Sequence, residues 1–277
     1  MIPLTLSIAL VLLVVLDMTV GTVRTRRALA TFEATPANRV RYYRIFIVSG
    51  WARAAAATLV TFTAGLSLSG IGLSAAGGGP TGGARYGWLL AWLLAAYLIF
   101  GYGFGAVRVR YSMRAGQVYP QRARTAALIP RTTRERWYAA AMAVTAGIAE
   151  EIFFRGALIA LGIEVFHLPA PAAAAVSLVL FTGIHAHQGR PGLLNSGFIG
   201  FCLTFLTLQA GSLLPAMVVH TMVNVWALLV VPAEPTAVPA DGTAVAAHRG
   251  AVEQAAVLVD TAPAAGVPAI RPPIPAG

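Results

Sequence analysis

The sequence contains no lysine, a single cysteine and few charged residues of either sign. Among its 277 residues are 20 basic residues, all of them arginine, and 10 acidic residues. Charged residues make up 11% of the chain, less than half the share of about 25% that is usual in soluble domains. The lone Cys202 excludes an intrachain disulfide framework and a multi-cysteine metal site. The scarcity of charge excludes an ordinary soluble globular protein.

Apolar residues dominate instead, at 57% of the chain with a mean hydropathy of +0.73. A membrane-crossing helix needs about 20 mostly apolar residues. Seven stretches meet or approach this length: Pro3–Val20, Ile45–Leu73, Tyr86–Val107, Tyr138–Val165, Pro171–Ile184, Leu193–Ala210 and Leu213–Val231. We therefore predict an all-α, polytopic transmembrane helix bundle of about seven spans.

The arginines are distributed unevenly along these predicted spans. Seventeen lie in segments on one side of the membrane, Arg85 lies on the other side, and Arg53 and Arg155 fall inside spans. Cytoplasmic loops carry the excess of basic residues in membrane proteins. We therefore expect a multi-pass protein of the inner (plasma) membrane, with its N-terminus outside and its C-terminus in the cytoplasm. The net charge of +10 then reflects topology and contact with membrane lipids, and predicts no nucleic-acid partner.

Composition divides the chain into three parts. Residues 1–132 hold the first three spans and their basic cytoplasmic loops. Residues 133–231 form a helical core that contains most of the intramembrane polar residues. Residues 232–277 are rich in Pro and Ala and lack an amphipathic period, which predicts a disordered cytoplasmic tail.

Ionisable groups inside a span are costly and are candidates for function. Ala149-Glu150-Glu151-Ile-Phe-Phe-Arg155 lies well inside the fourth span. Glu151 and Arg155 are four residues apart and share a helix face, so they can pair. Glu150 points about 100° away in an α-helix. It could face a wet cavity and act as a general base.

Two later spans carry residue pairs at the same helical spacing, and each pair includes a histidine. Phe181-Thr-Gly-Ile-His185 ends the fifth span, and His220-Thr-Met-Val-Asn224 lies in the seventh. Asn224 can orient His220 or bind a substrate, because residues four apart share a face. His187 follows His185 on a different face, and we interpret it as a loop residue.

Asp17 lies near the end of the first span, close in sequence to Arg24. We expect a structural ion pair with the nearby arginines at the membrane interface. Arg53 is expected to extend towards the interface, and no chemistry is assigned to it.

This set of side chains could activate water, with a glutamate accepting the proton and His or Asn stabilising an oxyanion. No serine or cysteine with an evident nucleophile motif stands beside the histidines. Glu150, His185 and His220 are also possible zinc ligands by residue type. We expect a site without a cofactor, and zinc remains the alternative.

The three motifs, Glu150-Glu151-x-x-x-Arg155, Phe181-x-x-x-His185 and His220-x-x-x-Asn224, occur in the order found in the CPBP family. The sequence resembles these CAAX-protease and bacteriocin-processing (ABI) intramembrane endopeptidases over about Thr133–Val231. The resemblance implies a helix bundle with a polar intramembrane cavity. It also implies hydrolysis of a peptide bond in a membrane-embedded or lipid-modified substrate.

The resemblance further implies a role for each motif residue. Glu150 would be the general base, and Glu151 would support it with Arg155 as its partner. His185 and His220 would hold the water or stabilise the oxyanion, and Asn224 would donate to the oxyanion.

A glutamic, metal-independent protease is the preferred type, with a zinc metalloprotease as the alternative. The composition fits a high-GC bacterium, so a prenylated substrate is not assumed. A proton-coupled transporter and a non-catalytic scaffold or bacteriocin-immunity protein are the alternative functions. The sequence does not indicate an oligomeric state.

Overall fold

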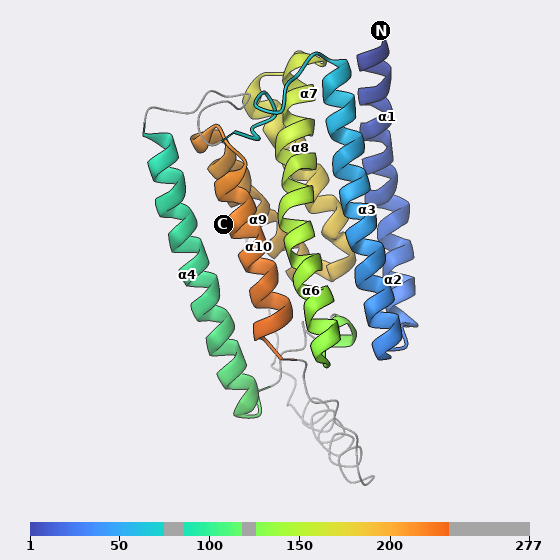
Figure 1. The fold of residues 1–277 in the computed structure, drawn as a ribbon, viewed down its shortest axis with the longest axis vertical. Helices are drawn as coiled ribbons and strands as arrows, with labels where there is room; N and C mark the ends of the chain where they lie inside the picture. The colour runs from blue at the N-terminus through green and yellow to red at the C-terminus, as the bar shows by residue number, and fades with distance from the viewer. Residues whose placement is uncertain (75–85, 118–125, 233–277) are drawn as a thin grey trace, which may run out of the picture. The chain divides into compact units, whose positions relative to one another are not determined.

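The computed structural model describes residues 1–74, 86–117 and 126–232. The helices of this part pack side by side (Figure 1), and no strand occurs among the described residues. Their all-α arrangement confirms the fold class predicted from composition. The predicted disordered tail, apart from Pro232, lies outside the described residues.

The chain begins with one long helical run. It comprises α1 (Ile2–Leu16), the π-helical turn η1 (Asp17–Gly21) and α2 (Thr22–Ala30). A π-turn carries i→i+5 hydrogen bonds and often marks a functional position in a helix. The first predicted span therefore extends ten residues further than its apolar part, into the arginine-rich segment.

The second predicted span is wrong at both ends. Helix α3 begins at Pro36 and ends at Thr63 (Pro36–Thr63). It begins early because Thr35 caps it, accepting a hydrogen bond from the backbone N–H of Asn38, and because Pro36 suits the first helical turn. It ends early because Gly65, with a φ of 77°, turns the chain.

The remaining helices follow the predicted spans more closely. After α4 (Gly87–Arg114) comes the short 3-10 turn η2 (Ala126–Leu128). The next helical run consists of α6 (Thr133–Thr145), η3 (Ala146–Glu150), η4 (Ile152–Leu158) and α7 (Ile159–Glu164). The last elements are α8 (Ala170–Ile184), the 3-10 turn η5 (His185–Gln188), α9 (Gly189–Ala210), α10 (Leu214–Val225) and η6 (Trp226–Val230).

Helices α8 and α9 pack against each other, with Gly197 beside Thr182 and Gly200 beside Leu178. This pairing is antiparallel, so η5 reverses the chain.

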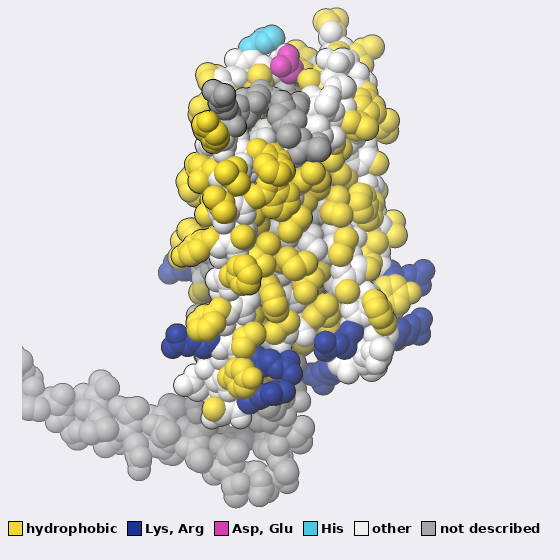
Figure 2. Space-filling model, turned by 60° about the vertical axis from the view of Figure 1, so that its left-hand side comes forward, with side chains coloured by type: hydrophobic (Ala, Val, Ile, Leu, Met, Phe, Trp, Pro, Cys, Tyr) yellow, Lys and Arg dark blue, Asp and Glu magenta, His cyan; other side chains and the backbone are white. Residues whose placement is uncertain are grey.

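Four helical runs of the described residues are long and apolar enough to cross a membrane: Ile2–Ala30, Pro36–Thr63, Gly87–Arg114 and Ala170–Ala210, the last of which includes the reversal. The distribution of side chains on the surface also indicates a membrane protein. Figure 2 shows a broad apolar band on the visible face, with the arginine side chains gathered towards one end of the helices. The number of seven spans and the orientation of the termini stay predictions.

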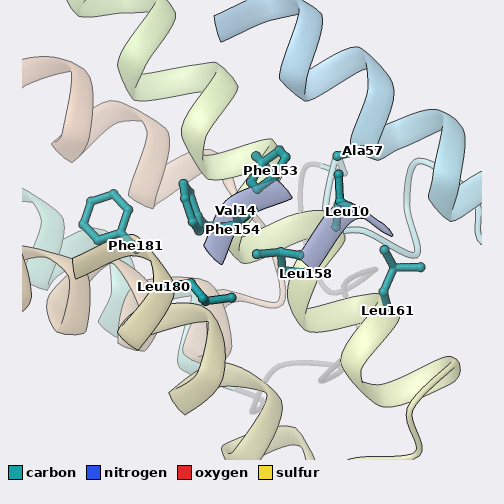
Figure 3. Close-up of a cluster of buried hydrophobic side chains, with 10 residues drawn as sticks. Leu10, Val14, Ala57, Phe153, Phe154, Leu158, Leu161, Leu180 and Phe181 are labelled. Carbon is teal, nitrogen blue, oxygen red and sulfur yellow. The ribbon is translucent and has the colours of Figure 1, made fainter. Parts of the chain in front are cut away.

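A cluster of buried side chains joins the first helices to the core. Leu10 and Val14 of α1 pack with Phe153 and Phe154 of η4 and with Leu180 of α8 (Figure 3). The rings of Phe153 and Phe154 are 5.0 Å apart in an edge-to-face arrangement. This packing places the first helix beside the segment that carries the two glutamates.

A buried ion pair joins α3 to α6 at the arginine-rich end. Nε of Arg39 donates to Oε2 of Glu135 at 3.0 Å, and NH2 of Arg39 donates to Oε1 at 3.2 Å. Glu135 also closes a capping box with Thr132 at the start of α6. The hydroxyl of Tyr43 donates to the carbonyl of Leu128 at 2.6 Å. These bonds hold the start of α6 and the preceding turn η2 against α3.

Candidate active site

Glu150 and Glu151 lie where the helical run 133–164 changes from α to π geometry. Ala146–Glu150 and Ile152–Leu158 are π-helical, and Glu151 stands between them. The wider π-turn changes the angle between successive side chains from its α-helical value. Both carboxylates consequently approach one residue of another helix, His220.

Glu151 and Arg155 form the pair that their spacing predicts. NH1 of Arg155 donates to Oε1 of Glu151 at 3.0 Å, and both side chains are fully buried. Arg155 also donates to the carbonyl of Gly200 at 3.1 Å and to the hydroxyl of Thr204 at 3.4 Å. A buried charge is tolerated when it is paired and its donors are satisfied. Arg155 therefore joins η4 to α9 while it neutralises Glu151.

His220 of α10 completes this buried group. Its Nδ1 lies 2.7 Å from Oε1 of Glu151, the oxygen that also accepts from Arg155. A carboxylate that is paired with an arginine is an acceptor, so Nδ1 of His220 carries the proton in this bond. The other ring nitrogen, Nε2, faces Glu150 and lies 3.9 Å from its Oε2.

A close approach of two helices makes this contact possible. A Cβ atom on Gly147 would lie 2.6 Å from the backbone N of Thr221 and would also collide with the Thr221 hydroxyl. Only glycine allows η3 and α10 to come this close. Thr221 directly follows His220, so the missing side chain at Gly147 sets the distance between the histidine and the glutamates.

Glu150 differs from Glu151 in its surroundings. Its side chain is 13% exposed, whereas that of Glu151 is fully buried. Within the described part of the chain, Oε2 of each carboxylate is buried and accepts no hydrogen bond, but Oε1 of Glu151 accepts from both Arg155 and His220, whereas Glu150 lines a cavity. A buried carboxylate oxygen without a partner is costly unless water or a ligand binds it. Glu150 is thus the acidic group that is open to a reaction partner.

The ring of Phe181 packs against three polar side chains of the site. Its ring centre lies 4.7 Å from that of His185 and 5.9 Å from that of His220. The guanidinium of Arg155 lies 4.0 Å above the same ring. The backbone carbonyl of Phe181 is 2.8 Å from Nδ1 of His185. A carbonyl only accepts, so Nδ1 of His185 donates and its Nε2 remains an acceptor when the ring is neutral.

Two predicted residues lie apart from these contacts. Asn224 is half-buried on α10, one turn after His220, and makes no hydrogen bond with another described residue. His187 lies in η5, where its Nδ1 approaches the carbonyl of Ile184 at 3.0 Å and its ring stacks on His185. The turn itself is held by Arg26 of α2, which donates to the carbonyl of Ala186.

A cavity of about 450 Å³ opens from Glu150 towards the first and third helices. Its walls include Leu13, Val14 and Phe153, and its polar lining includes Asp17 and Arg53. Such a volume suits a short peptide segment or part of a lipid chain. The first two predicted spans therefore contribute to the surroundings of Glu150.

Asp17 and Arg53 form an ion pair at 3.6 Å, and each side chain is about half exposed. The expected structural pair of Asp17 exists, but its partner is Arg53 of α3, to which the sequence analysis assigned no chemistry. Sequence separation conceals this contact. The signal that could have revealed it was the presence of one acid and one arginine in two neighbouring apolar helices.

Thr204 and Gly147 are further residues that sequence reasoning missed. A threonine in the apolar stretch of α9 can bond the preceding turn, and Thr204 does donate to the carbonyl of Gly200 at 2.8 Å. Its second role, accepting from Arg155, depends on how α9 packs. A glycine three residues before Glu150 was the available signal for a close helix contact.

No group of three His, Cys, Asp or Glu side chains among the described residues is placed to hold a metal ion. Nδ1 of His220 and Nδ1 of His185 are both engaged in hydrogen bonds, which leaves Nε2 of each ring as the nitrogen that could bind a ligand. The preference for a glutamic over a zinc type therefore stays a prediction.

Comparison with known proteins gives one match. Residues 132–226 match the family model described as Rce1-like, type II CAAX prenyl endopeptidase Rce1-like. Neither a curated protein nor a solved structure matches the chain. The matched segment contains all three motifs, and it confirms the resemblance to the CAAX protease family.

Proposed function

The chain carries, at residues 132–226, a domain of the Rce1-like CAAX endopeptidase family, and from this premise we propose that it is an intramembrane endopeptidase in which Glu150 activates water. The observation that carries the proposal is the difference between the two glutamates. Glu151 is fully buried and accepts hydrogen bonds from Arg155 and His220, whereas Glu150 pairs with no arginine among the described residues and lines the cavity.

The attacking water binds between Glu150 and His220. Oε2 of Glu150 and Nε2 of His220 are 3.9 Å apart, and a single water can lie at hydrogen-bonding distance, about 2.8 Å, from both. It donates one hydrogen to each acceptor, because Nδ1 of His220 holds the ring proton against Glu151. This geometry directs one lone pair of the water away from the protein, towards a substrate.

The reaction then needs only protein groups and water. Glu150 takes a proton from the water while the water oxygen bonds to the carbonyl carbon of the substrate. The carbonyl oxygen becomes an oxyanion, and the side-chain amide of Asn224 donates to it. The C–N bond breaks, and Glu150 returns its proton to the leaving nitrogen, so a carboxylic acid and an amine are formed.

The remaining residues of the site support Glu150 and His220, which bind the water. Arg155 and Glu151 fix the orientation of His220, and His185 packs against the ring of Phe181 with its Nε2 left as an acceptor when the imidazole is neutral. Exclusion of bulk water by the helices strengthens each of these electrostatic interactions. The substrate is a membrane-associated peptide or protein that reaches Glu150 through the cavity lined by Asp17 and Arg53.

Replacement of Glu150 by Gln tests the proposal. Because a general base contributes about 10²–10⁴-fold to a rate, we expect E150Q to reduce cleavage by that factor while the protein still folds. The matched control is E164Q, which removes an exposed glutamate at the end of the same helical run. The assay uses purified protein in detergent and fluorogenic peptides with and without a prenylated C-terminal cysteine.

Chelator treatment separates the two protease types. A glutamic enzyme retains its cleavage rate in a chelator and contains no stoichiometric metal by elemental analysis. Loss of activity in the chelator with recovery on zinc addition would contradict the proposed mechanism. Cleavage by E150Q at the rate of E164Q would contradict the role of Glu150, and a wild-type protein that cuts none of the peptides would favour a transporter or a scaffold.

A further inference from the structure

A second cavity lies between α3 and α6, outside the candidate active site. Its volume is about 950 Å³. Three exposed arginines line it, Arg41 and Arg44 from α3 and Arg134 from α6. Arginine pairs readily with phosphate groups, because its planar donors match phosphate oxygens.

The positive charge of this cavity is not neutralised by the protein. The one acidic residue in its wall, Glu135, accepts from Arg39 and from the backbone N–H groups of Arg131 and Thr132. Within the described ranges, none of the three lining arginines forms an ion pair with an acid. Three like charges around one space repel one another unless an anion binds among them.

The cavity also continues into an apolar face. Arg41, Ile45 and Val48 follow one another at helical spacing on α3, and all three line the cavity. Ile45 is 58% exposed and Val48 is 70% exposed. A ligand that fills this space has an anionic group at the arginines and an apolar part along Ile45 and Val48.

The walls of the cavity are held in place before any ligand binds. The Arg39–Glu135 pair and the Tyr43–Leu128 hydrogen bond join α3 to α6 and to η2 beside it. The arginine-rich end of the helices is also where the apolar band ends (Figure 2). Lipid phosphates are found at this level of a membrane, and basic pockets between helices bind anionic head groups.

We propose that the cavity between α3 and α6 binds an anionic phospholipid, with its phosphate among Arg41, Arg44 and Arg134 and one acyl chain along Ile45 and Val48. This site is separate from the proposed peptidase centre and its test does not depend on cleavage.

The test is native mass spectrometry of the full chain in mild detergent with added phosphatidylglycerol or phosphatidylcholine. We expect the wild type to retain phosphatidylglycerol in preference to phosphatidylcholine. The triple variant R41Q/R44Q/R134Q should bind phosphatidylglycerol about a hundredfold more weakly. The matched control is R27Q/R108Q/R114Q, which removes the same charge from exposed positions outside the cavity and should bind as the wild type does.

Three outcomes would overturn the proposal. They are equal retention of the two lipids by the wild type, equal loss in the two triple variants, and full retention in R41Q/R44Q/R134Q. Protection against thermal unfolding supplies a second measurement, in which phosphatidylglycerol should stabilise the wild type and inorganic phosphate should not. Equal stabilisation by inorganic phosphate would contradict the role of Ile45 and Val48. Size-exclusion chromatography shows whether each variant is folded.

Discussion

Single residues divide into charges that hold helices together and charges that remain available for chemistry. Arg39, Glu135, Glu151 and Arg155 are all fully or almost fully buried and are engaged in two pairs. Glu150 belongs to neither pair and lines the cavity beside α1 and α3. Replacing any of the paired residues is expected to affect folding first, whereas Glu150 can be replaced with less effect on stability.

Glu135 is one of the charges that hold helices together, and the pH dependence of stability tests this role. Burial by itself raises the pKa of Glu135, but hydrogen bonds from Arg39 and the backbone N–H groups of Arg131 and Thr132 outweigh it, so the pKa lies below its ordinary value of 4.5. The stabilisation is complete above the unfolded pKa and is lost as the pH falls through the folded pKa. We therefore expect the wild type to lose thermal stability on acidification below about pH 4.5.

The variant E135Q should be less stable than the wild type at neutral pH, by about 3 kcal/mol, because Arg39 is left buried without its partner. Its stability should also change less on acidification, since the titrating carboxyl is gone. Thermal unfolding in detergent across this pH range measures both effects, with E164Q as the control for an exposed glutamate. An identical pH profile for E135Q and the wild type would show that another group governs the acid sensitivity.

At the scale of helices, close packing at one glycine determines whether the site assembles. Gly147 lets η3 approach α10, and this contact brings His220 to Glu151 and towards Glu150. The π-helical turns on either side of Glu151 direct both carboxylates to that histidine. Packing and local helix geometry both contribute to this arrangement.

Replacement of Gly147 by Ala should therefore reduce activity as well as stability. The added methyl group would push α10 away, and overpacking of this kind costs about 1–3 kcal/mol. The matched control is Gly105→Ala on α4, where a Cβ atom would meet no atom within 4 Å. That change should leave cleavage unaffected and should stabilise the helix slightly.

The two effects of Gly147→Ala are separated by measuring cleavage well below its unfolding temperature. A variant that is folded but slow supports the link between helix distance and the site. Full activity in a folded Gly147→Ala variant would show that α10 does not need this close approach.

For the molecule as a whole, the arginine distribution predicts the orientation in the membrane. Thr31 lies between α2 and α3 at the arginine-rich end, and Glu164 lies at the end of α7. If arginine-rich segments are cytoplasmic, then Thr31 faces the cytoplasm and Glu164 faces outside. The same orientation would place the proposed phospholipid site in the inner leaflet.

Cysteine labelling measures this orientation. In a C202A background, T31C and E164C supply one exposed thiol each. A membrane-impermeant maleimide added to intact cells should label E164C and leave T31C unlabelled until the cells are lysed. The reverse pattern would mean that the N-terminus is cytoplasmic, and labelling of both variants in intact cells would indicate a damaged membrane.

The sequence alone determined the class of protein, the positions of most helices and the residues that cannot face lipid. Low charge, apolar runs of span length and three motifs at helical spacing are local properties, so they can be read along the chain. The pairing of Glu151 with Arg155 could be predicted for the same reason, because residues four apart share a helix face.

Only the tertiary structure decided which residues meet across helices. The π-turns around Glu151, the partnership of Arg53 with Asp17 and the early start of α3 depend on packing or capping contacts that have no local period. The close approach at Gly147 is a further case, because a glycine in an apolar helix does not by itself reveal what lies against it. Such contacts join residues far apart in sequence, and it is their distances that distinguish the neutralised Glu151 from the available Glu150.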